Sequence, residues 1–311
     1  PVTDPLPEPA SHDAAAPPRF RVGVVGVGRA GAVLGAALNR AGHEVVAVSA
    51  VSEASLTRAE AMLPRARVTT PQQVVARVDL VLLTVPDDVL AGLVAGLAGQ
   101  GSFRAGQLVV HASGRYGAGV LAEATRHGAL PLALHPVMTF TGTSVDLARL
   151  DGCPFGVTAP EPLRPVAEAL VVEMGGDPVW VPEDCRELYH AALAHGANHL
   201  VTLVAQTLDL LAAAGVDQPA ALVSPLLHAA LDNALAAGDR ALTGPVARGD
   251  AGTVAAHLAA MADRADTATR TAYVAMARAT ADRALASGML RAEAAEALLD
   301  VLAGRDEEEA R

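Results

Sequence analysis

Short runs of β-branched and other apolar residues alternate with alanine- and leucine-rich stretches in the first half of the chain. Runs of four to seven residues, separated by segments with a helical pattern, are typical of βαβ units and of a mostly parallel sheet that is covered on both faces. The pattern predicts an α/β domain with strands at 21–25, 44–48, 67–70, 79–85, 107–111, 129–135, 154–158 and 178–181.

After about Pro182 the strand-like runs stop and longer helical patterns follow. Gly215 and Gly238 stand directly after the first two of these segments, as is typical of helix ends. We expect an all-α C-terminal domain at 183–304 after the α/β domain at 20–182, with helices at 184–214, 219–237, 253–259, 267–287 and 291–302. The proline-rich residues 1–19 and the acidic residues 305–311 are expected to be tails.

A glycine-rich segment joins the first predicted strand to the first predicted helix. Gly26, Gly28 and Gly31 form a Gly-x-Gly-x-x-Gly motif, which allows a tight turn, close approach of a pyrophosphate and close packing of the helix on the strand. Together with Arg29 and Ala30, these glycines are expected to contact a dinucleotide. The sheet is therefore predicted to be a doubly wound Rossmann sheet, and a glycine turn without a ligand is the weaker alternative.

The end of the second predicted strand bears on the choice of cofactor. An NAD-specific site carries Asp or Glu there, whereas this chain has Ser49 and Ser52, with Arg58 further along. Hydroxyls and an arginine suit a 2′-phosphate, which favours NADP over NAD. The alternative is that the two serines only cap the following helix.

Composition narrows the function further. The 311 residues carry a net charge of −11 and 3% aromatic residues, which argues against nucleic-acid binding. All 23 basic residues are arginines, so lysine-based Schiff-base and phosphate-loop chemistry is excluded. Two cysteines and no expected membrane span or secretion signal indicate a cytoplasmic protein.

Three loops follow later predicted strands and so lie at the expected ligand-binding edge of the sheet. Val85 and Pro86 are expected to line the cofactor, while the two aspartates after them suit a helix start better than catalysis. Ser113 offers a hydroxyl for a substrate carboxylate, or is part of an ordinary turn. His135, held extended by Pro136, faces the nicotinamide or simply ends its strand.

The first helix of the C-terminal domain carries polar groups among small residues. His190 and Asn198 are candidates for proton transfer and substrate binding, and by the rise of a helix they lie about 12 Å apart. His195 and His199 have the spacing of a metal pair but lack the usual acidic partners, so no metal is expected. Gly196 suggests that something packs closely against this helix, which is expected to be buried.

A polar loop at 241–250 lies between two later predicted helices. Arg248 is a candidate clamp for a substrate carboxylate, in one chain or across a dimer interface. An internal pair with Asp250 is the equal alternative.

These residues together resemble a bacterial family of Rossmann-like oxidoreductases with a conserved C-terminal helical domain, within the 6-phosphogluconate-dehydrogenase-like superfamily. The resemblance extends from about Phe20 to Leu302 and is most specific in the loop Leu242–Asp250, the helix around His190 and Asn198, and the His135–Pro136 loop. It implies similarity to pyrroline-5-carboxylate reductase and ketopantoate reductase. The latter depends on a lysine on the interdomain helix, where this chain has none.

The expected function is an NADPH-dependent reduction of a small keto acid, with ketopantoate as the best single substrate. In this hypothesis His190 supplies the proton or orders a water, Asn198 and Ser113 hold the oxyanion or carboxylate, and Arg248 anchors the carboxylate. The alternatives are imine reduction and a dinucleotide-binding sensor or scaffold without turnover. A homodimer through the C-terminal helices is expected, with no nucleic-acid or membrane partner.

Overall fold

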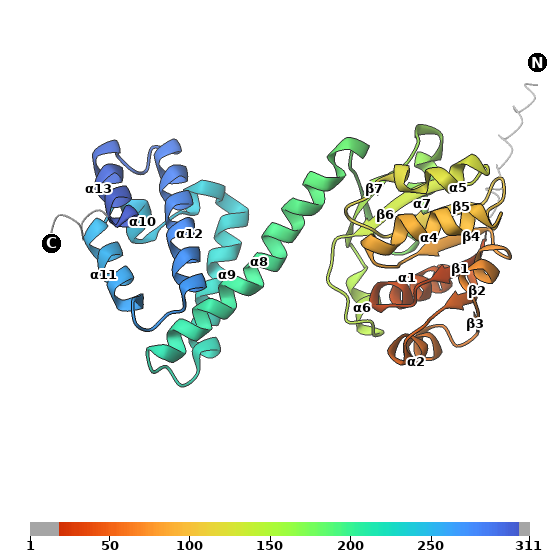
Figure 1. Ribbon diagram of the computed structural model, residues 1–311, viewed down its shortest axis with the longest axis horizontal. Helices are drawn as coiled ribbons and strands as arrows, with labels where there is room; N and C mark the ends of the chain where they lie inside the picture. Colours follow the sequence, from red (N-terminus) through yellow and green to blue (C-terminus); the bar gives the residue numbers. More distant parts are fainter. Residues whose placement is uncertain (1–18, 305–311) are drawn as a thin grey trace, which may run out of the picture. The chain divides into compact units, whose positions relative to one another are not determined.

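The computed structural model describes residues 19–304 (Figure 1). The tails expected at 1–19 and 305–311 lie outside these residues, except for Arg19. Arg19, which was assigned to the first tail, forms an ion pair with Glu173 at 3.1 Å.

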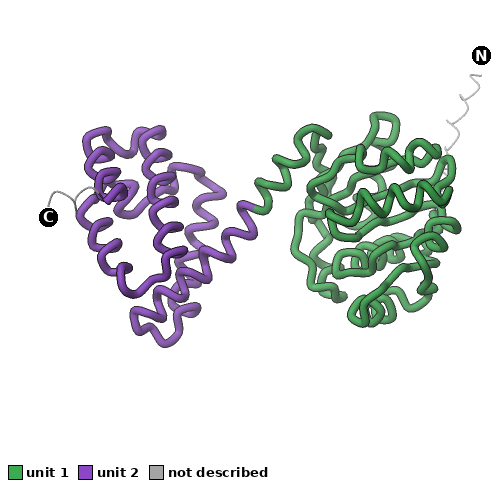
Figure 2. Tube along the Cα trace, in the orientation of Figure 1, with its two compact units in different colours: residues 1–194 green, residues 195–311 purple. Residues whose placement is uncertain are grey.

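The chain divides by its internal contacts into two compact units, Pro1–Ala194 and His195–Arg311 (Figure 2). We call them the sheet unit and the helical unit. The division falls inside a helix, at residue 194, rather than at the expected position near Pro182. The first turn of that helix belongs to the sheet unit because Arg186 and Tyr189 contact strands of the sheet.

The described part of the sheet unit contains one sheet of eight strands in the order β3-β2-β1-β4-β5-β6-β7-β8. All neighbouring strands pair parallel except β6 with β7. This confirms the predicted mostly parallel, doubly wound sheet. The strands are β1 (Arg21–Val25), β2 (Glu44–Ser49), β3 (Arg67–Val68), β4 (Leu80–Leu83), β5 (Leu108–His111), β6 (Leu130–Pro136), β7 (Pro154–Thr158) and β8 (Asp177–Trp180).

Both faces of the sheet are covered, because the inner strands are apolar on both sides. One face packs against α1 (Arg29–Arg40), α2 (Glu53–Met62) and α7 (Arg164–Glu173). The other packs against α3 (Pro71–Val75), α4 (Asp87–Gly99) and α5 (Ala122–Arg126). The short helix α6 (Val145–Arg149) follows β6 and contacts α1.

The helical unit contains most of α8 (Arg186–Ala213) and the helices after it. Its core is formed by alanines, leucines and a valine of the last four helices and the connection before α13. The segment 241–250 was predicted to be a loop, whereas Gly244–Arg248 is helical, with Pro245 in the first turn and Gly249 at the C-cap with φ +73°. The remaining helices are α9 (Pro219–Ala237), α10 (Gly244–Arg248), α11 (Ala251–Met261), α12 (Thr267–Ala286) and α13 (Ala292–Ala303).

Helices α8 and α9 expose apolar side chains. Arg186 is the buried residue of α8, so the expectation of a buried helix is wrong for the single chain. A Cβ at Gly196 would meet nothing within 4 Å, and the close packing expected there is likewise absent. Leu226 and Leu235 on α9 are 68% and 79% exposed.

One stretch, Pro219–Arg248, is long and apolar enough to cross a membrane by length and composition alone, with 6% of its most apolar window buried. The sequence analysis did not expect such a stretch. Helix α9 ends at Ala237, and a one-turn 3-10 helix (Gly238–Ala241) interrupts the stretch before α10. The exposed apolar face of α9 therefore needs a partner or another apolar environment.

Candidate active site

The glycine turn lies where the strand order reverses, between β1 and β4, the point at which open α/β sheets bind ligands. The N–H groups of Gly26 and Val27 donate to the carbonyl oxygen of Ser49 at 3.1 and 3.2 Å. The Thr84 hydroxyl, just after β4, donates to the carbonyl oxygen of Gly26 at 2.6 Å. The turn is thus fixed to both neighbouring strands.

Each glycine of the motif has the geometry that its expected role requires. Gly26 has φ +94°, which favours glycine. A Cβ at Gly31 would lie 2.3 Å from both the Gly26 carbonyl oxygen and the Thr84 hydroxyl oxygen, so helix and strand pack without room for a side chain. A Cβ at Gly28 would meet nothing within 4 Å, which leaves open space for a phosphate beside the backbone. These residues fit a dinucleotide.

The other expected cofactor residues lie around this turn. Arg29 and Ala30 begin α1, whose first N–H groups have no helical partner. A Cβ at Gly26 would lie 3.0 Å from a methyl of Val85, and Pro86 caps the next helix. The motif therefore sits between the first turn of α1 and the β4–α4 connection.

The two serines at the end of β2 play different parts. Ser49 is buried, and its carbonyl oxygen holds the glycine turn. Ser52 forms a reciprocal capping box with Ser55 at the start of α2. Ser52 therefore caps the following helix, as in the alternative stated from the sequence. Arg58 forms no ion pair among the described residues and is half-buried on the same helix.

A second group of side chains gathers at the carboxyl ends of β5 and β6. His135 lies near the end of β6, and Tyr189 and His190 lie in the first turns of α8. The Tyr189 hydroxyl is 2.8 Å from Nδ1 of His135, and the rings of His135 and His190 are 6.3 Å apart. A Cβ at Gly114 would lie 2.9 Å from Nε2 of His135 and 2.8 Å from Cδ2 of His190. The two histidines therefore meet above Gly114.

Ser113 lies in the same loop, next to Gly114, and is buried. Its N–H donates to Nδ1 of the buried His111, and its hydroxyl oxygen accepts from the N–H of Tyr116 at 3.2 Å. The His111 ring also bonds the Gly117 carbonyl oxygen at 2.9 Å. The Ser113 oxygen therefore accepts a hydrogen bond within an ordinary turn, as in the alternative stated from the sequence. Its hydroxyl proton is free to donate to a bound group.

A buried arginine fixes the start of α8 to the sheet. Arg186 is 1% exposed; its Nε donates to the Thr158 hydroxyl at 2.7 Å and its Nη2 to the carbonyl oxygens of Ala133 and Gly156 at 3.1 and 3.0 Å. No carboxylate pairs with it among the described residues. Its charge therefore acts on the neighbouring rings, including Tyr189, whose ring centre is 5.6 Å away.

Burial keeps both His135 and Tyr189 neutral near pH 7, and the charge of Arg186 adds to this effect at His135. Burial first, and then the charges of Arg186 and His190, lower the pKa of His135 to about 4. Burial raises the pKa of Tyr189, against the opposing effect of Arg186. Neutral His135 and neutral Tyr189 carry one exchangeable side-chain proton each. One of these protons lies in the hydrogen bond between Nδ1 and the phenol oxygen. The other lies on Nε2 of His135 or on the phenol oxygen of Tyr189, where it can be donated to a substrate.

Tyr189 and Arg186 were not among the candidates from the sequence. One feature of the sequence does point to this contact: a glycine, Gly156, lies in the interior of β7, opposite His135. A glycine inside a strand often marks a place where another group approaches closely. A Cβ there would lie 2.3 Å from the Tyr189 hydroxyl oxygen. The glycine thus leaves room for the tyrosine, but the sequence does not say which residue fills that room.

The other two candidates lie in the helical unit. Asn198 is exposed on α8. Arg248 ends α10 and forms no ion pair in the described part of the chain, whereas Asp250 caps α11 by accepting from Thr253. The ring nitrogens of His195 and His199 are 2.9 Å apart, and the described residues hold no group of three potential metal ligands. The parts assigned to Asn198 and Arg248 stay predictions.

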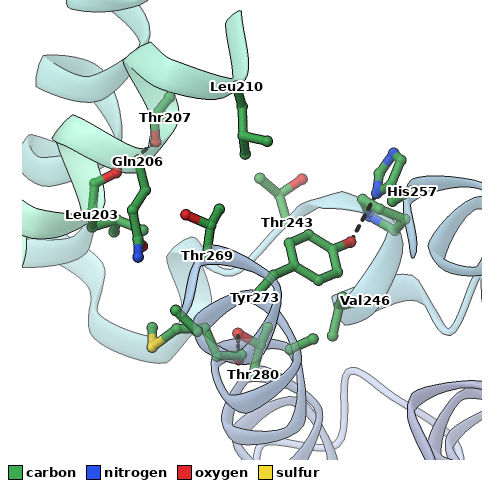
Figure 3. A pocket seen from close by; sticks show the side chains of 14 residues that line it. Leu203, Gln206, Thr207, Leu210, Thr243, Val246, His257, Thr269, Tyr273 and Thr280 are labelled. Atoms are coloured by element: carbon green, nitrogen blue, oxygen red, sulfur yellow. Dashed lines mark hydrogen bonds between the residues drawn. The ribbon is translucent and has the colours of Figure 1, made fainter. Parts of the chain in front are cut away.

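The helical unit has a hollow of about 360 Å³ of its own, between α8, the start of α10, α11 and α12. Figure 3 shows the Tyr273 ring pointing across it to His257, whose Nδ1 is 2.8 Å from the phenol oxygen. The hydroxyls of Thr207 and Thr280 bond carbonyl oxygens of their own helices. No arginine lines this hollow, so its walls do not provide a carboxylate clamp.

Comparison with known families gives two successive matches. Residues 6–136 match the model of a Rossmann-like domain, and residues 153–280 match a domain of unknown function (DUF2520). The resemblance to Rossmann-like proteins with a distinct C-terminal domain is thereby confirmed. A search of curated proteins finds no significant match.

Solved structures share the fold across most of the chain. A candidate NADP oxidoreductase from Bacteroides fragilis is 22% identical, with a TM-score of 0.68, and the match covers 85% of this chain and 98% of that one. An imine reductase from Myxococcus stipitatus in complex with NADP⁺ is 18% identical, with a TM-score of 0.64 and coverages of 84% and 94%. Pyrroline carboxylate reductase from Plasmodium falciparum is 11% identical, with a TM-score of 0.53 and coverages of 84% and 98%.

The neutral buried histidines make the stability of the sheet unit depend on pH. Burial lowers the pKa of both His111 and His135 to about 4, from 6.5 in an unfolded chain. The unfolded chain therefore binds more protons between these values, and the free energy of unfolding falls as pH drops from 6.5 to 4, by on the order of 3 kcal/mol per histidine. Urea unfolding followed by fluorescence of Trp180, the single tryptophan, measures this.

His111→Asn is expected to reduce this pH dependence, and replacing the exposed His127 by Asn is the matched control that leaves it unchanged. A wild-type sheet unit with equal unfolding free energy at pH 6.5 and pH 4.5 would contradict the prediction.

Proposed function

We propose that this protein is an NADP-dependent reductase that transfers hydride to the carbonyl carbon of a small keto acid, with ketopantoate as the first substrate to test. The observation that carries the proposal is the hydrogen-bonded pair of His135 and Tyr189, with His190 beside it, at the carboxyl edge of a sheet whose glycine turn fits a dinucleotide. Such a cluster provides a proton donor at the edge of the sheet where the nicotinamide of a Rossmann cofactor is expected.

The choice of NADP rests on the end of β2. No acidic side chain stands between Ser49 and Ser52, the first one being Glu53 in the first turn of α2, and neither Arg29 nor Arg58 has a carboxylate partner among the described residues. A 2′-phosphate supplies an anionic partner for these two arginines. The imine reductase from Myxococcus stipitatus, which shares the fold, was solved with NADP⁺.

The chemistry divides among the residues of the cluster. A bound cofactor would supply the hydride. The Tyr189–His135 pair holds a proton at its free end, and His190 closes the other side of the space above Gly114. The buried positive charge of Arg186 stabilises negative charge that develops on the substrate oxygen. The hydroxyl of Ser113 is a further donor, while Asn198 and Arg248 keep their proposed part in holding the carboxylate.

Imine reduction is the second candidate. It is favoured by the names of structural relatives, which include imine reductases and pyrroline carboxylate reductase. Against it stands Arg186, because a buried cation opposes the positive charge of an iminium ion and favours an alkoxide. The two reactions therefore differ in the sign of the charge that the site must accept.

Oxidation of NADPH in the presence of ketopantoate, a panel of other keto acids and 1-pyrroline-5-carboxylate tests the proposal. We expect keto-acid turnover, and a fall in kcat of about 100-fold or more in Tyr189→Phe and His135→Asn, because each removes a proton-transferring group. His195→Asn, on an exposed part of the same helix, is the matched control with unchanged kcat. Turnover of the imine alone would favour the second candidate, and tight NADPH binding without any turnover would favour a sensor.

We also propose a homodimer formed through α8 and α9. A hollow of about 470 Å³ between these helices is lined by apolar side chains, and further leucines on α9 are exposed. Monomers seldom leave a continuous apolar surface of this kind uncovered, and a second copy offers the same surface in return.

Light scattering is expected to give twice the 31.5 kDa mass of one chain. The double substitution Leu226→Glu and Leu235→Glu should shift the mass to that of a monomer, since it places charges at exposed positions on two sides of α9. Val179→Glu, at a half-exposed position of β8, is the control. A monomeric wild type, or a wild type that floats with lipid vesicles, would contradict the dimer.

A further inference from the structure

Two arginines of the cofactor region converge on one glycine of a distant loop. Arg29 begins α1 and Arg58 lies on α2, whereas Gly142 follows β6. A Cβ at Gly142 would lie 2.9 Å from Cγ of Arg29, 3.1 Å from its Cα and 3.0 Å from Nε of Arg58. The backbone after β6 therefore touches both arginines at once.

A buried carboxylate holds this backbone in place. Asp146, on α6, accepts hydrogen bonds from the N–H of Thr141 at 2.7 Å, its hydroxyl at 3.0 Å and the N–H of Gly142 at 2.8 Å. Its side chain is fully buried, and it has a distant ion pair with Arg149 at 3.5 Å. Gly142 has φ +83°, a conformation that favours glycine. The turn at 141–144, here called the β6 turn, is thus built by one side chain.

The base of the Arg29 side chain and the guanidinium of Arg58 lie beside this turn, and neither arginine pairs with a carboxylate in the described part of the chain. Two unpaired arginines in one region favour the binding of an anion there. Arg58 belongs to the helix that follows β2, where the adenosine ribose of a Rossmann cofactor is expected. A phosphate on that ribose is the anion whose expected position fits this pair.

We propose that the β6 turn is a wall of the cofactor's phosphate site and that Asp146 is a positioning residue which, through this turn, directs Arg29 and Arg58 toward the 2′-phosphate of NADP(H). This inference rests on the proposed function only in its choice of cofactor. The β6 turn sets the selectivity between the phosphorylated and unphosphorylated ribose, although it lies about 90 residues from the end of β2 in sequence.

The binding of two fragments to the full-length protein tests this without catalysis. Adenosine 2′,5′-bisphosphate differs from AMP only by the 2′-phosphate, so titration calorimetry with each isolates the contribution of that group. The wild type is expected to bind the bisphosphate at least about tenfold more tightly than AMP. Arg58→Gln should remove most of this difference and leave AMP binding within about twofold.

Two substitutions change the turn and leave both arginines in the chain. Asp146→Asn removes the charge that holds the turn, and Gly142→Ala places a methyl group against both arginines. Each is expected to weaken bisphosphate binding about tenfold and AMP binding less than twofold. Gly152→Ala is the matched control: Gly152 also has a positive φ, of +69°, but a Cβ there would meet nothing within 4 Å. Trp180 fluorescence checks that each variant is folded.

Equal losses for the two fragments, or no loss in either turn variant, would overturn the inference. A wild type that binds both fragments equally would overturn it together with the choice of NADP. A protein that discriminates as expected but reduces no substrate would leave the inference standing and reject the proposed reductase activity. The failures of the two proposals are therefore distinguishable.

Discussion

The buried guanidinium of Arg186 is the constraint on which the candidate active site depends. It joins three separate segments, because it donates to Ala133 on β6 and to Gly156 and Thr158 on β7 from the first turn of α8. These bonds orient the start of α8 on the sheet, and the same turn directs Tyr189 to His135. The same charge, together with burial, lowers the pKa of His135. Arg186 therefore both fixes the start of α8 to the sheet and contributes to the lowered pKa of His135.

Local sequence patterns were sufficient for the fold of the sheet unit. The β-branched runs predicted all eight strands to within a few residues, and the three glycines of the motif have distinct geometries that match distinct requirements. Both signals are local, since periodicity and glycine spacing reflect backbone preferences. The antiparallel pairing of β7 with β6 was not predicted, because the direction of a strand depends on the connection before it.

The site was predictable only in part. His135 and His190 were found because histidines near strand ends and on a polar helix face are unusual, and the structure brings them together above Gly114. Tyr189 and Arg186 were missed because their roles depend on how α8 docks on β6 and β7, a tertiary contact that no spacing in the sequence encodes. The exposure of α8 and α9 was missed for a related reason, since an apolar helix looks the same in a core and in an interface.

His135 is held neutral beside a buried cation and is hydrogen-bonded to Tyr189. An NMR titration of the protein with isotope-labelled histidine, assigned by the loss of one resonance in His135→Asn, measures the pKa of this residue. We expect His135 to titrate with a pKa of about 4, and Arg186→Met to raise this value. A His135 that titrates near 6.5 in the wild type would show that burial and Arg186 do not hold it neutral.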